Sequence, residues 1–127
     1  MGKKLTIKEL MAQKEQLKNK KTETVDLYVD CLDAEITVVI PTASLILEAQ
    51  SQGEVNKTRA DYYLIFNSVK EPNLKDAELQ NAYGCVEPLD IVENIFLPGE
   101  VSAIAGAIMD LAGYGTSVSK VGKEIKN

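Results

Sequence analysis

The chain has 127 residues, 45% of them hydrophobic, which suits one domain with a modest core. Its formal charge of −5 is unevenly distributed, with +5 in residues 1–21, −12 in residues 22–119 and +2 in residues 120–127. An acidic body repels phosphates, so we expect no nucleic acid partner. The basic segment could instead meet the acidic body of a neighbouring subunit, which predicts self-association that weakens as salt rises.

The residue types needed for metal binding or catalysis are scarce. The sequence has no histidine, and its two cysteines, Cys31 and Cys85, lie far apart without C-x-x-C spacing. Zinc sites usually draw on Cys and His clusters, and no phosphate-binding or nucleophile motif is present. We therefore expect no metal, no cofactor and no enzymatic activity. Both thiols are predicted to be buried in a reducing compartment, which indicates a cytoplasmic protein.

The N-terminal third predicts one helix and one β-hairpin. Thr6 and Glu9 have the spacing of a capping box, which predicts a helix over residues 6–19 within a basic arm, residues 1–21. Residues 24–31 alternate strictly between apolar and polar, and residues 35–40 are rich in β-branched side chains. This pattern predicts an antiparallel hairpin with one wet face. Its dry face must pack on helices or on further strands, because two strands alone are marginal in water.

The remainder of the chain predicts helices. Thr42 can cap a helix that Gly53 ends, and a second helix with the apolar run Tyr62 to Phe66 follows. Asn73 can cap the next helix. A short helix after Glu87 and Pro88 and a final helix over about residues 99–112 complete the series. The fold class is thus α+β, mostly helical with about five to six helices, and with the N-terminal hairpin packed on them. We expect a single domain over residues 22–113 and a flexible tail over residues 114–127.

The final helix has few charges. Glu100 and Asp110 are only ten residues apart in this segment, whereas a membrane span needs about 20 mostly apolar residues, so we expect no membrane partner. One side of the helix is apolar and predicted to be core, with Ile104 and Ile108 among its residues. A glycine inside a helix costs about 0.5–1 kcal/mol relative to alanine, which close approach of another backbone would offset. The candidate partner-binding residues are therefore the small ones on the far side together with two aromatic residues of the earlier run: Tyr62, Phe66, Ala103, Gly106 and Ala107.

The second half of the sequence resembles a known family. The segments "LKDAELQNAYG" (74–84), "EPLDIVENIFLPGEVSAI" (87–104) and "MDLAGYG" (109–115) are similar to the phage tail assembly chaperones of Gram-positive phages and prophages. The resemblance implies a non-catalytic protein of the bacterial host cytoplasm that binds the tape measure protein and keeps it soluble during tail morphogenesis. It also implies self-association, with the tail tube protein as a further candidate partner.

Two other functions remain open from the sequence. One is a structural tail or head–tail completion protein, which would be found in purified virions. The other is an acidic inhibitor of a host nucleic-acid-binding protein, which would need its carboxylates arrayed at phosphate-like spacing. The sixteen carboxylates of residues 22–119 are instead distributed over helix starts and turns.

Overall fold

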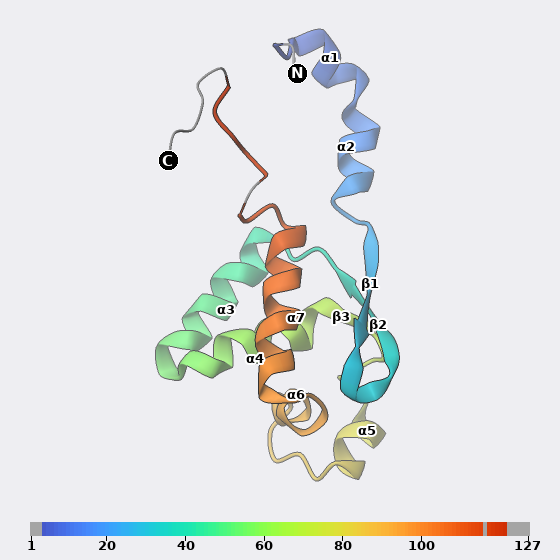
Figure 1. Cartoon of the computed structure of the whole chain (residues 1–127), viewed down its shortest axis with the longest axis vertical. Coiled ribbons are helices and arrows are strands. Elements are labelled where there is room, and N and C mark those ends of the chain that lie inside the picture. The colour runs from blue at the N-terminus through green and yellow to red at the C-terminus, as the bar shows by residue number, and fades with distance from the viewer. Residues whose placement is uncertain (1–3, 116, 122–127) are drawn as a thin grey trace.

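The structure is a computed structural model that describes residues 4–115 and 117–121. Within these residues the chain forms seven α-helices, a three-stranded antiparallel sheet and one short 3-10 helix (Figure 1), which confirms the predicted α+β class. The helices are α1 (Ile7–Ala12), α2 (Lys14–Lys20), α3 (Ala43–Val55), α4 (Lys57–Ser68), α5 (Ala77–Ala82), α6 (Asp90–Ile95) and α7 (Pro98–Leu111). The strands are β1 (Thr24–Val29), β2 (Ala34–Val39) and β3 (Val69–Glu71), and the 3-10 helix is η1 (Asp30–Leu32).

The predicted hairpin is present and gains a third strand. β1 and β2 pair from Thr24 opposite Val39 to Val29 opposite Ala34, and β3 pairs with the other edge of β2. Burial along β1 alternates as expected for a sheet with one wet face. The turn closes with η1 and with Asp33 in the left-handed conformation at φ 48°, which aspartate tolerates better than most residues.

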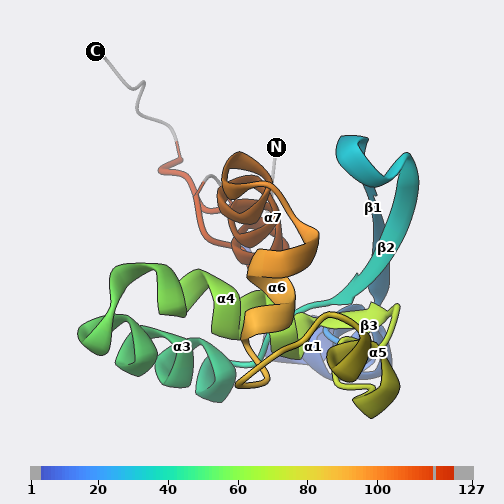
Figure 2. The same ribbon diagram turned by 90° about the horizontal axis from the view of Figure 1, so that it is seen from below.

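Helices α3 and α4 form a layer, and α7 and the hairpin lie on one side of it. α3 and α4 run side by side, α7 packs across α4, and the β1–β2 hairpin rises next to α7 (Figure 2). The core lies where these elements meet, and it includes Ile36, Ile65, Ile91 and Ile108, each almost fully buried. The predicted apolar side of the last helix is confirmed as core, since Val101, Ile104, Ala105 and Ile108 are all buried.

Several local predictions were wrong, each for a physical reason. The first helix is interrupted at Gln13, whose backbone angles of φ −94° and ψ 6° depart from helical values and separate α1 from α2. Gly53 does not end its helix, because α3 continues to Val55 and the glycine instead allows close approach of α4. A Cβ at residue 53 would lie 3.1 Å from the Cβ of Ala60. The fifth helix is capped by Asp76, which accepts from Leu79 N–H, and not by Asn73.

The prediction that both thiols are buried was wrong for Cys31. Cys31 is exposed because the chain leaves β1 at Val29 and turns through η1, so the alternation that predicted an inward Cys31 stops two residues early. Cys85 is half-buried and packs against the core. The predicted tail includes residues 116 and 122–127, which lie outside the described residues, while residues 117–121 have no helix or strand.

Candidate functional site

The aromatic candidates lie on α4 and are half-buried. Tyr62 and Phe66 both pack against the core. Phe66 borders a shallow cavity of about 290 Å³ between α3, α4 and residues 87–89. The ammonium group of Lys75 lies 5.4 Å from the centre of the Phe66 ring and covers part of it. These residues are therefore largely engaged within the chain.

The small-residue candidates lie on the outer side of α7. Ala103 and Gly106 are exposed and Ala107 is half-buried. A Cβ built at Gly106 has no heavy atom within 4 Å, apart from chain neighbours and the helix's own backbone, so no other element of this chain approaches the glycine closely. The cavity beside Phe66 has no lining residue from α7. The structure thus places the five predicted residues on two surfaces and does not combine them in one pocket.

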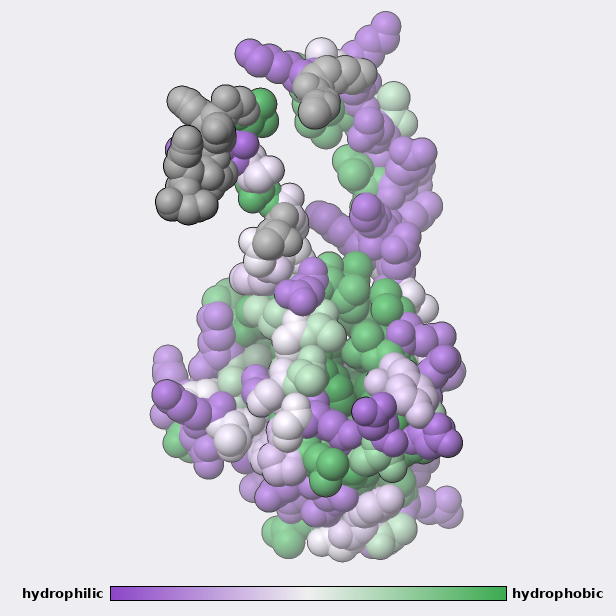
Figure 3. Space-filling view, viewed as in Figure 1, coloured by the Kyte–Doolittle hydropathy of each residue, from purple (hydrophilic) through white to green (hydrophobic). Residues whose placement is uncertain are grey.

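A larger apolar cavity was not predicted from the sequence. It has a volume of about 580 Å³ and lies at the root of the N-terminal arm, between the start of β1, the start of α3 and the end of α7. We call it the root groove; its lining residues are Lys20, Lys21, Glu23, Val25, Ile40, Pro41, Thr42, Ala43, Leu111 and Ala112. Figure 3 shows hydrophobic side chains gathered between α7 and the hairpin, below the arm. No local pattern could have revealed the root groove, because it joins three distant parts of the chain.

One carboxylate links the hairpin turn to the start of α7. Glu100 accepts hydrogen bonds from the thiol of Cys31 at 2.9 Å, from the backbone N–H of Cys31 at 3.1 Å and from that of Leu97 at 3.0 Å. The Cys31 thiol, followed by the Leu97 N–H, lowers the pKa of Glu100, because each donor favours the charged carboxylate. The same hydrogen bond to Glu100 is the main cause that raises the pKa of the Cys31 thiol. Cys31 is therefore held as a weakly nucleophilic thiol.

This link predicts a specific acid sensitivity. A carboxyl group whose pKa is lowered by folding stabilises the fold above its unfolded pKa, and this stabilisation is lost as pH falls through the folded pKa. We expect Glu100→Gln to lower the free energy of unfolding at pH 7, with the difference from wild type shrinking below about pH 5. Urea unfolding at several pH values measures this. Glu93→Gln removes the same charge at an exposed position and is the control. If Glu100→Gln lowered the free energy of unfolding equally at pH 7 and pH 3, the result would contradict the role of Glu100.

Charged side chains form few ion pairs in the part of the chain that the structure describes. The one ion pair there joins Arg59 and Glu87 at 3.1 Å on the rim of the cavity beside Phe66. No group of three or more His, Cys, Asp or Glu side chains suited to a metal ion occurs among the same residues. No helix within residues 4–115 and 117–121 is long and apolar enough to cross a bilayer. The surface of the described residues is thus marked by apolar areas and by charged side chains with few ion pairs.

These features define a small α+β protein that exposes apolar surface on its arm and in the root groove. The model of the phage XkdN-like tail assembly chaperone family matches residues 7–126. The chain belongs to this family, which confirms the resemblance noted from its C-terminal half.

One solved structure shares the fold. It is a crystal structure of the protein YqbN, a structural-genomics target, which is 15% identical in sequence with a TM-score of 0.61. The alignment covers 75% of this chain and 88% of YqbN, so the fold is similar over most of both proteins. A comparison with curated proteins gives no match.

Proposed function

We propose that this chain binds the phage tape measure protein and keeps it soluble in the cytoplasm of the bacterial host until the tail assembles. It does so without catalysing a reaction. Membership of a tail assembly chaperone family supports the proposal. The observation that carries it is the root groove, an apolar cavity of about 580 Å³ at the base of the arm.

The physical argument rests on what a soluble protein exposes. Large contiguous apolar surfaces on such a protein mark sites for a partner, and an amphipathic helix of a client can place its apolar face in such a groove. The net charge of −5 on the whole chain helps to keep the protein and its complexes in solution. The small residues of α7 offer a second, smoother contact for a client helix.

Co-expression with the tape measure protein tests the proposal. We expect the soluble fraction of the tape measure protein to rise severalfold when this chain is present and the two proteins to copurify. An equal amount of precipitated tape measure protein with and without this chain would contradict the proposal. Recovery of this chain in purified virions would favour the structural alternative.

A single substitution tests the contribution of α7. Gly106→Leu fits sterically, because a Cβ at this position meets open space, and it removes a helix penalty of about 0.5–1 kcal/mol. We expect unchanged or higher thermal stability but a smaller soluble fraction of the tape measure protein in co-expression. Ser51→Leu, which adds the same side chain at an exposed position of α3, is the matched control. Equal soluble fractions for the two variants would exclude the small-residue face as a contact.

A further inference from the structure

The N-terminal arm carries an apolar stripe that its own chain does not cover. Neither α1 nor α2 contains a buried residue, and Figure 1 shows the arm extending from β1 away from the body. Its exposed large hydrophobic residues are Leu5, Ile7, Leu10, Met11 and Leu17. Isolated helices shorter than about 12–15 residues are marginal in water, and α1 and α2 have six and seven residues. The arm therefore gains stability if another surface covers this stripe.

The charge of the arm indicates which surface this is. Six lysines lie in the described part of the arm, and none of them forms an ion pair within residues 4–115 and 117–121: Lys4, Lys8, Lys14, Lys18, Lys20 and Lys21. A partner surface that combines negative charge with exposed apolar atoms complements both the lysines and the stripe, whereas a neutral apolar surface complements the stripe alone.

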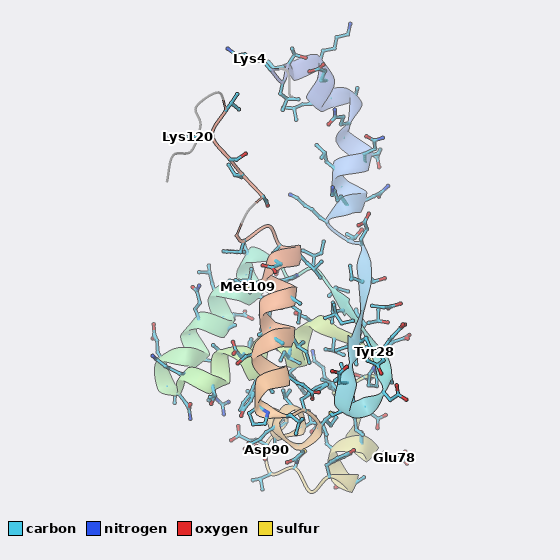
Figure 4. The ribbon with its side chains drawn as sticks, viewed as in Figure 1. Lys4, Tyr28, Glu78, Asp90, Met109 and Lys120 are labelled. Carbon is cyan, nitrogen blue, oxygen red and sulfur yellow. The ribbon has the colours of Figure 1, made fainter. Side chains whose placement is uncertain are left out.

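The outer face of the β1–β2 hairpin has this combination. Residues 24–39, which form the hairpin, contain four exposed carboxylates and no lysine or arginine: Asp26, Asp30, Asp33 and Glu35. Tyr28 is 59% and Leu32 40% exposed among them. Figure 4 shows Tyr28 on the hairpin and Lys4 at the far end of the arm, well apart from each other. An arm that continues the direction of β1 points away from the hairpin of its own chain.

We propose that the arm of one copy docks on the outer face of the hairpin of a second copy. Its apolar stripe covers Tyr28 and Leu32, and its lysines face the hairpin carboxylates. A reciprocal pair, in which each copy supplies one arm and one hairpin, satisfies both contacts through a two-fold axis. The contact involves two copies of this chain alone, so it stands or fails independently of the proposed binding of the tape measure protein.

Sedimentation velocity of the full chain at two salt concentrations is the first test. We expect a species of at least twice the 13.9 kDa monomer mass in 0.1 M NaCl. We also expect the apparent dissociation constant to rise at least about tenfold in 1 M NaCl, because exposed charges are then screened within about 3 Å. A monomer at both salt concentrations, or an association that salt does not weaken, would overturn the proposal.

Complementary charge reversal gives the decisive test. An arm variant with Lys8, Lys14 and Lys18 changed to Glu and a hairpin variant with Asp26, Asp30 and Glu35 changed to Lys should each be monomeric, since each brings like charges together. An equimolar mixture should associate again, because arm and hairpin are then of opposite charge in both contacts. Lys57→Glu, Lys70→Glu and Lys120→Glu together change the same charge outside the arm and should leave association intact. Folded variants that stay apart when mixed would refute the arm–hairpin contact.

Discussion

Ile108→Asp is expected to unfold the protein. Ile108 lies in the middle of α7 at 0% exposure, packed in the core beneath this helix. The change removes a large apolar side chain and buries a carboxylate without a partner, a combined cost of at least about 4 kcal/mol. A domain of this size has a total stability of only about 5–15 kcal/mol. We therefore expect loss of the helical circular dichroism signal or recovery in the insoluble fraction.

Ser102→Asp is the matched control for this prediction. Ser102 is an exposed residue of the same helix, and surface changes of this kind alter stability by about 0.5 kcal/mol or less. It introduces the same side chain without burying it. A soluble, fully helical Ile108→Asp protein would show that α7 does not pack as described.

Ile65→Ala is expected to have the next largest effect. Ile65 is fully buried in α4, the helix that packs against both α3 and α7. Truncation to alanine leaves a cavity at this junction and should lower the free energy of unfolding by about 2–5 kcal/mol. Urea unfolding measures the change. Ile65→Val removes one methylene group and should cost about 0.5–1.5 kcal/mol, so equal losses for the two variants would contradict tight packing around this side chain.

Patterns with a strong local cause were predictable from the sequence. The alternation of residues 24–29 specified β1, and the spacing of Val101, Ile104 and Ile108 specified the buried side of α7. Thr6 and Glu9 form the predicted capping box, with each side chain accepting from the other residue's N–H. In each case a few neighbouring residues contain the whole signal.

Features that depend on distant partners were not predictable. β3 has only three residues and exists because Val69 reaches β2, which no local pattern indicates. A glycine such as Gly53 is typical of a helix end, yet here it lies inside α3 and allows close approach of Ala60 on the next helix. The root groove combines residues near positions 21, 41 and 111, so it arises only when the fold brings them together.

The attachment of the hairpin has a consequence for its motion. At its base the hairpin is held by the pairing of β2 with β3, whereas its tip is held to the body by the hydrogen bonds of Cys31 to Glu100. The hairpin is thus attached to the body at both ends, by strand pairing at its base and by side-chain hydrogen bonds at its tip. Loss of the Cys31–Glu100 hydrogen bonds would let solvent reach Val29 and Ile36, so Glu100→Gln at unchanged pH should make the amide protons of these two residues exchange with deuterium faster than in the wild type.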